Sequence, residues 1–157
     1  MKIKLPEDMA AAPALASRLI SAVESELDPR LIVIHPGKDD VRVVFDSVNK
    51  LYVVIYDRGV ARVSCGPVRR NLWAFDFDSA TEWINSVAAF VLDLMNHTVR
   101  LECTYTRSKR CVKQAIWRIN DQGVFERLIV LPKTSNLFSL LSRRNRRETL
   151  TVTLCQQ

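Results

Sequence analysis

Glycine and histidine are scarce in this sequence, with 4 and 2 copies in 157 residues. The motifs that depend on them are missing: we find no Gly-rich phosphate loop, no G-x-S-x-G, no H-E-x-x-H and no clustered cysteine and histidine ligands. His35 and His97 are the only side chains that ordinarily titrate near neutrality, and neither lies in a motif with a nucleophile. We therefore expect structural or helix-capping roles for both histidines.

Two acidic pairs are the remaining candidates for catalysis or metal binding. Asp76 and Asp78 in "FDFD", and Asp39 with Asp40 in "GKDD", could hold a cation or form an acid–base pair. Asp78 is more simply the residue before a helix start, and "GKDD" is more simply a turn. The sequence therefore predicts a protein that is not an enzyme and that has no metal and no cofactor.

Long apolar runs and paired cysteines are absent as well. The most apolar stretch, "WINSVAAFVLDLM" (83–95), is interrupted by polar residues and falls short of the roughly 20 residues that cross a bilayer. Glu7 and Asp8 interrupt the basic start before any apolar run, so we expect no export signal. The 4 cysteines form no CxxC pair, and we expect buried free thiols. These absences predict a cytoplasmic protein with no membrane span.

What the chain does have is the composition of one globular domain. Apolar residues make up 48% and charged residues 25% of the 157 positions, which is enough for a single sizeable core. We predict one domain over residues 1–157. The predicted class is α+β, with antiparallel sheet and two main helices packed on one face.

The two helices are predicted at 14–27 and 79–96. The apolar residues of the first recur every four positions: Leu15, Leu19, Val23 and Leu27. Ser79 and Glu82 announce the second helix, because their S-x-x-E spacing is that of a capping box. Apolar residues cover more than one stripe of this second helix. We expect it to be central to the core, although a partner that covers it is the alternative.

Short apolar runs after each helix predict antiparallel strands joined by hairpin turns. The expected strands are 31–35, 41–45, 51–56 and 60–65 after the first helix, and 98–106, 112–119, 124–131 and 148–154 after the second. The residues expected to face the core in the second set are Leu101, Cys103, Trp117, Ile119, Leu150 and Val152.

The two sets of strands contain a pair of similar segments. "IYDRGVARVSC" (55–65) and "INDQGVFERLI" (119–129) share Ile, Asp, Gly and Val at the same relative positions. The common D-x-G-V predicts a tight hairpin turn in which glycine supplies the positive φ. Two half-repeats, 1–78 and 79–157, would explain the similarity, and chance recurrence of one turn type is the alternative.

The order helix, strands, helix, strands resembles the layout of type III secretion chaperones, which are small cytoplasmic dimers that bind effector proteins. The resemblance implies a binding protein without catalysis. The chain departs from that family in two ways, because those chaperones are typically acidic and end in a helix, whereas this chain has a pI of about 9.4 and a predicted final strand.

Positive charge is concentrated in the second half of the chain. Residues 1–78 hold 11 basic and 11 acidic residues, whereas residues 79–157 hold 12 and 6, a net charge of +6. The cations gather in "TRSKR" (106–110) and "RRNRR" (143–147). Arginine dominates, which favours bidentate contacts with carboxylate or phosphate. The candidate partner-binding residues are Arg107, Lys109, Arg110, Arg143, Arg144, Arg146 and Arg147.

"RRNRR" is either a partner contact or a solvated basic turn. If the basic segments are contacts, they predict an acidic partner, and two kinds are open. An acidic protein is the first, and its most concrete form is a toxin, since bacterial immunity proteins are often compact domains of this type. A nucleic acid such as RNA is the alternative, but neither basic segment contains an aromatic residue on which bases would stack. Trp73, in the connection 66–78, is a further candidate interface residue. We favour the simpler role, in which Trp73 and Phe75 close the core beneath this connection.

Overall fold

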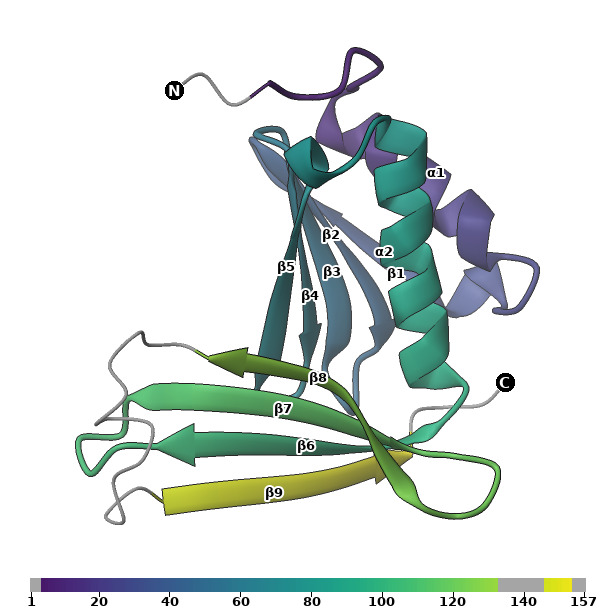
Figure 1. Ribbon diagram of the computed structural model, residues 1–157. Helices are drawn as coiled ribbons and strands as arrows, with labels where there is room; N and C mark the ends of the chain where they lie inside the picture. Colours follow the sequence, from purple (N-terminus) through teal and green to yellow (C-terminus); the bar gives the residue numbers. More distant parts are fainter. Residues whose placement is uncertain (1–3, 133–145, 154–157) are drawn as a thin grey trace. The chain divides into compact units, whose positions relative to one another are not determined.

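The computed structural model describes residues 4–132 and 146–153, which contain two α-helices and two antiparallel β-sheets of five and four strands. The predicted α+β class is therefore confirmed. The chain divides into two compact units (Figure 1). Unit 1 comprises the chain up to Cys65 together with Arg70–Asp93, and unit 2 comprises Gly66–Arg69 together with the described residues from Leu94. The single domain and the half-repeats stay predictions.

Helix α1 (Ala12–Val23) begins two residues before the predicted start and ends four residues before the predicted end. Pro13 lies in its first turn, where a missing N–H costs nothing. The side chain of its own N-cap residue accepts no hydrogen bond. Instead the Ala12 N–H donates to Oδ1 of Asp57 at 2.7 Å, so a carboxylate 45 residues further along the chain caps this helix.

The early end of α1 follows from the residues after it. Pro29 opens a short 3₁₀ helix, η1 (Pro29–Leu31), and a residue that precedes proline disfavours the helical conformation. Leu27 nevertheless donates its N–H to the carbonyl of Val23 at 3.0 Å. Because of this extra turn, Leu27 is buried as the helical pattern predicted, even though the helix itself has ended.

The unit 1 sheet is a meander in which each strand pairs with the next in the chain. Its strands are β1 (Val33–Pro36), β2 (Asp40–Asp46), β3 (Leu51–Tyr56), β4 (Val60–Cys65) and β5 (Val68–Trp73). Four of them match predicted runs. β5 was missed, because "VRRNLW" has too few apolar residues to show a period. A 3₁₀ turn, η2 (Ala74–Asp76), follows it.

One face of this sheet and the two helices form the unit 1 core. Val43, Val53 and Val63 lie side by side on β2, β3 and β4 and are buried, and α1 packs on β2 and β3. Helix α2 (Ala80–Met95) contributes Trp83, which is fully buried and donates its indole N–H to the carbonyl of Leu72 at 3.2 Å. The burial of Trp83 supports the expectation that α2 is central.

The start of α2 has the predicted cap with one difference. Oγ of Ser79 accepts the Glu82 N–H at 3.1 Å, as a capping box requires. The Glu82 carboxylate accepts the N–H of Asp78 at 3.3 Å rather than that of Ser79. A second carboxylate, from Asp8 near the start of the chain, accepts the Ala80 N–H at 2.7 Å. Both helices are thus capped by an aspartate that is distant in sequence.

The unit 2 sheet has the strand order β8-β7-β6-β9, so the last strand lies beside the first. Its strands are β6 (Thr98–Tyr105), β7 (Cys111–Ile119), β8 (Phe125–Pro132) and β9 (Arg146–Thr153). Each strand pairs antiparallel with its neighbours, as predicted. Val99, Leu101 and Cys103 of β6 are buried.

The predicted inward orientation of Trp117 and Ile119 is wrong. The register pairs Leu101 with Ile116 and Arg100 with Trp117, so Trp117 lies on the opposite face from Leu101. Both Trp117 and Ile119 are half-buried. Strand β7 has apolar residues on both of its faces. Pairing with β6 places Ile116, rather than Trp117, on the buried face. Leu150 and Val152 pair with Leu101 and Val99, but their side chains lie outside the described residues.

The two D-x-G-V segments adopt the same turn. Gly59 has φ +80° and Gly123 has φ +77°, the left-handed conformation that favours glycine. Each glycine N–H donates to the carbonyl three residues earlier, on Tyr56 at 3.1 Å and on Asn120 at 2.9 Å. The predicted turn geometry is confirmed at both places.

Candidate functional site

The β6–β7 turn presents three exposed cations from a closed loop. The Thr106 N–H donates to the Arg110 carbonyl at 2.8 Å, and Oγ1 of Thr106 accepts the Arg110 N–H at 3.1 Å. Lys109 adopts φ +64°, and its N–H donates to the Thr106 carbonyl at 2.9 Å. Thr106 therefore fixes the turn with its backbone and its side chain, and the turn holds Arg107, Lys109 and Arg110 at its exposed surface.

Strand pairing brings the second basic segment to this turn. β9 runs antiparallel to β6, with Arg146 opposite Tyr105 and Arg147 opposite Thr104. A pocket at this end of the unit 2 sheet is lined by residues of both segments; we call it the basic pocket. Its lining residues are Tyr105, Thr106, Arg107, Lys109, Arg146 and Glu148. Arg110 is exposed in the same turn, and Arg143 and Arg144 lie outside the described residues.

The cations around the basic pocket differ in whether a carboxylate forms an ion pair with them. Arg146 pairs with Glu148 at 3.0 Å. Arg147 pairs at 3.2 Å with Glu102, whose side chain is only 10% exposed and which also lies 3.7 Å from Arg100. Within the described residues, no carboxylate is in ion-pair distance of the three turn cations. The uncompensated charge is therefore concentrated on Arg107, Lys109 and Arg110.

The Tyr105 hydroxyl and the thiols of Cys65 and Cys103 remain protonated at neutral pH. Burial, together with the contact with Cys103, raises the pKa of Tyr105 to about 12. Burial also raises the pKa of Cys103 to about 11 and that of Cys65 to about 12. A protonated phenol can donate a hydrogen bond to an anion, whereas thiols with raised pKa values are poor nucleophiles. Neither of these cysteines lines the basic pocket, whereas the Tyr105 hydroxyl does and can donate to a bound anion.

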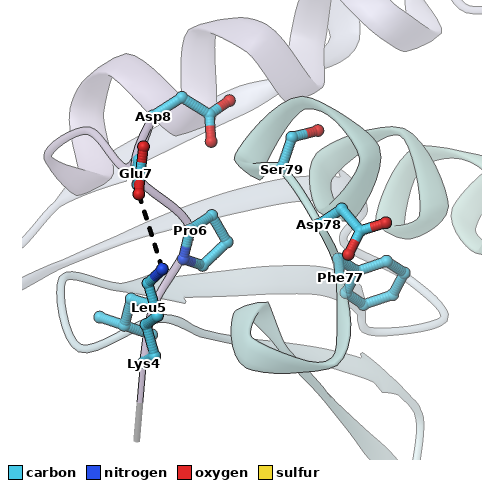
Figure 2. Close-up of a pocket in the computed structure, with 8 residues that line it drawn as sticks. All are labelled: Lys4, Leu5, Pro6, Glu7, Asp8, Phe77, Asp78 and Ser79. Carbon is cyan, nitrogen blue, oxygen red and sulfur yellow. Dashed lines mark ion pairs between the residues drawn. The ribbon is translucent and has the colours of Figure 1, made fainter.

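A second pocket lies in unit 1, between the start of the chain and the start of α2. Figure 2 shows its lining, which is Lys4, Leu5, Pro6, Glu7, Asp8, Phe77, Asp78 and Ser79. Lys4 pairs with Glu7 at 3.6 Å, and both side chains are highly exposed. The Ala80 N–H is the main cause that holds the pKa of Asp8 below its ordinary value of 3.8. Because Asp8 is engaged as a helix cap, it is not placed to act as a general base.

Trp73 and His35, the remaining candidate residues, lie at the surface of unit 1. Trp73 is 37% exposed and Phe75 is 41% exposed, with ring centroids 5.6 Å apart. Our expectation that these two rings close the core is therefore wrong. His35 lies exposed on β1, and the part of the chain that the structure describes contains no group of three His, Cys, Asp or Glu side chains suited to a metal.

Sequence reasoning missed the carboxylates and the tyrosine at the basic pocket. Glu102 contacts Arg147 across the β6–β9 pair, a placement that depends on register. Arg100 and Glu102 on β6, and Arg146 and Glu148 on β9, lie two residues apart on one strand, so strand alternation could have indicated that each pair shares a face.

Comparisons with known protein families, with curated proteins and with solved structures give no match that would place the chain in a family. Neither helix in residues 4–132 and 146–153 has the length and apolar character needed to cross a membrane, as predicted from the sequence.

Proposed function

We propose that the protein is a non-catalytic binding domain that receives carboxylates of an acidic protein partner at the basic pocket. One observation carries the proposal: the β6–β9 pairing puts Arg146 beside a turn whose three cations have no described carboxylate partner. Two segments that are far apart in sequence thus contribute to one binding surface. The most concrete form of this function is neutralisation of a toxin in the cytoplasm, and a secretion-chaperone-like role is its variant.

The internal ion pairs support a carboxylate partner. Arg146 and Arg147 already bind Glu148 and Glu102 at 3.0 and 3.2 Å, so arginine–carboxylate pairing is the chemistry present at this site. A nucleic acid would gain more from exposed rings among the cations. Tyr105 is half-buried and is the one aromatic residue that lines the pocket.

The first prediction tests this surface. The three turn cations are replaced by Ser, and a matched control replaces three exposed cations of unit 1, Arg18, Arg30 and Lys38, by Ser. The tagged proteins are used to capture partners from the native host with and without nuclease. We expect a nuclease-resistant partner whose association is roughly tenfold slower with the turn variant at low salt, because peripheral charges mainly steer encounter. The control should associate at the wild-type rate.

Two outcomes would contradict the proposal. One is equal association by the turn variant and the wild type. The other is a partner that is lost with the turn variant, that also disappears on nuclease treatment, and whose affinity falls log-linearly with salt, because counterion release from phosphates gives that dependence.

A further inference from the structure

The face of the unit 1 sheet that points away from the helices carries arginine and tyrosine side chains. Because strand residues alternate between faces, Arg42, Tyr52 and Arg62 lie opposite the buried Val43, Val53 and Val63. Arg42 is exposed, while Tyr52, Tyr56 and Arg62 are partly exposed. We call these four residues the Arg–Tyr face.

Arginines lie over the tyrosine rings of this face. The guanidinium of Arg42 lies 4.8 Å from the ring centroid of Tyr52. Tyr56 is approached by Arg58 at 5.0 Å and by Arg62 at 5.8 Å. A guanidinium stacked on a ring keeps its N–H edge available for an anion, and its plane extends the surface on which a planar group can stack.

The rows of the sheet alternate between rings and cations. Arg42 and Arg62 flank Val54 in one row, and Tyr52 lies in the next row, between Val44 and Ser64. Tyr52 and Tyr56 are four residues apart on one strand, a separation of about 13 Å. The cation row therefore lies between two aromatic positions.

The charge of this face favours an anion. Within the described residues, Arg42 and Arg62 have no carboxylate in ion-pair distance, and Arg62 instead donates to Oδ1 of Asn71 at 3.1 Å. His35 and Val54 complete their row, and the row of Tyr52 has no acidic residue. Asp40 pairs with Tyr56 across β2 and β3 and shares this face, and Asp39, Asp40 and Asp57 line a pocket with Tyr56 and Arg58 at this end of it.

More aromatic surface lies beside the β3–β4 turn. The Ala74 N–H donates to the Gly59 carbonyl at 2.9 Å, which places the end of β5 next to this turn. Trp73 and Phe75, both partly exposed, flank Ala74. The exposed rings of unit 1 thus continue from β3 toward the end of β5.

We propose that the Arg–Tyr face binds single-stranded nucleic acid, with bases stacked on the arginine-covered rings of Tyr52 and Tyr56 and phosphates held by the N–H edges of Arg42 and Arg62. Exposed sheet surfaces with aromatic side chains recognise unpaired bases in this way, and every base offers a face for stacking. An acidic protein would match the arginines, but aromatic positions that alternate with cations along one strand are the arrangement that receives successive bases and phosphates, so we assign nucleic acid. This site is separate from the basic pocket and does not depend on the proposed function.

The test measures binding of a fluorescein-labelled oligouridylate of about ten nucleotides by anisotropy. Four double variants are compared: Tyr52→Leu with Tyr56→Leu, Tyr52→Phe with Tyr56→Phe, Arg42→Gln with Arg62→Gln, and the control Arg18→Gln with Arg30→Gln. Each is made both alone and together with the Ser substitutions at the three turn cations, which removes attraction by the basic turn. Circular dichroism on heating shows which variants remain folded, and the Phe and Gln variants keep most of the apolar contact of the originals.

We expect the Leu variant to bind roughly tenfold or more weakly, because each stacked base is lost, and the Phe variant to bind like the wild type. The Arg variant should weaken binding and reduce the log–log salt slope by about 1.4, for two lost phosphate contacts. A duplex of the same length should bind more weakly than the single strand. The control should bind like the wild type.

The proposal is overturned if the Leu and Phe variants bind equally, if the control weakens binding as much as the Arg variant, or if the duplex binds as tightly as the single strand. It is also overturned if the Ser substitutions in the basic turn abolish all binding of the oligouridylate. That last result leaves the acidic-protein proposal to its own test, because capture of a nuclease-resistant partner is scored separately. Binding of polyglutamate, but not of oligouridylate, to the Arg–Tyr face would overturn the proposal as well.

Discussion

The two units use arginine differently. In unit 2, Arg147 and Arg100 converge on the buried carboxylate of Glu102, and Arg146 pairs with Glu148. In unit 1, Arg42 lies over a tyrosine ring and has no carboxylate within ion-pair distance among the described residues. The half of the chain with a net charge of +6 thus also contains arginines that are paired with carboxylates, whereas the half with net charge zero holds Arg42 and Arg62, which have no carboxylate partner among the described residues. Net charge alone does not locate the cations that are available to a partner.

The two units also differ in how far a tryptophan stabilises them, and we expect the largest change in the free energy of unfolding at these tryptophans. Trp83 in unit 1 is fully buried and its indole N–H has an acceptor, whereas Trp117 in unit 2 is half-buried and its indole N–H has no acceptor among the described residues. We expect Trp83→Ala to lower the free energy of unfolding by about 3–5 kcal/mol, as for large buried aromatic residues, and Trp117→Ala to lower it by clearly less.

Urea unfolding followed by circular dichroism measures both changes without relying on tryptophan fluorescence. Equal losses would show that the two units do not differ in how much they depend on a buried indole. The comparison would then have to be made on other residues.

The two glycine turns, at Gly59 and Gly123, allow a comparison in which the expected loss of stability is of intermediate size. An alanine at Gly59 or Gly123 must adopt a positive φ, which costs about 1 kcal/mol. The added methyl of Gly59→Ala would also lie 2.6 Å from Cδ2 of Leu5, whereas the methyl of Gly123→Ala meets nothing within 4 Å among the described residues. We expect Gly59→Ala to be the more destabilising of the two in thermal unfolding. The reverse order would mean that Leu5 moves aside at little cost.

The smallest effect concerns the aspartate that caps α2 in unit 1 and depends on pH. Hydrogen bonding by the Ala80 N–H lowers the pKa of Asp8 below 3.8, so the ionised cap stabilises the folded state above that pH. This stabilisation is lost as the pH falls through the lowered pKa. Asp8→Asn should therefore destabilise the protein slightly at pH 7, and the difference from the wild type should shrink below about pH 4.

Thermal unfolding of both proteins between pH 3 and 7 checks this prediction. Glu7→Gln is the matched control, because the neighbouring carboxylate of Glu7 is exposed and pairs with Lys4. The control should lower the melting temperature at pH 7 less than Asp8→Asn does. A difference between Asp8→Asn and the wild type that stays constant over the pH range would show that the charge of Asp8 does not contribute to the cap.

Local patterns in the sequence determined much of the fold. The spacing of Leu15, Leu19 and Val23 predicted α1, and Ser79 with Glu82 located the start of α2. Most strands followed from short apolar runs between turn residues, and both glycine turns were correct. These features depend on a few neighbouring residues, because propensity, capping and turn geometry act over short distances.

The tertiary structure alone decided what depends on register and on distant pairing. The sequence predicted Trp117 as a core residue, whereas pairing with β6 places Ile116 on the buried face instead. The remote caps Asp57 and Asp8, and the meeting of the two basic segments at Arg146, join residues far apart in the chain. The Arg–Tyr face likewise depends on three strands aligning their outward residues. A sequence pattern fixes the period of a strand, but a shift of one residue in pairing exchanges its two faces, and that choice is made by packing.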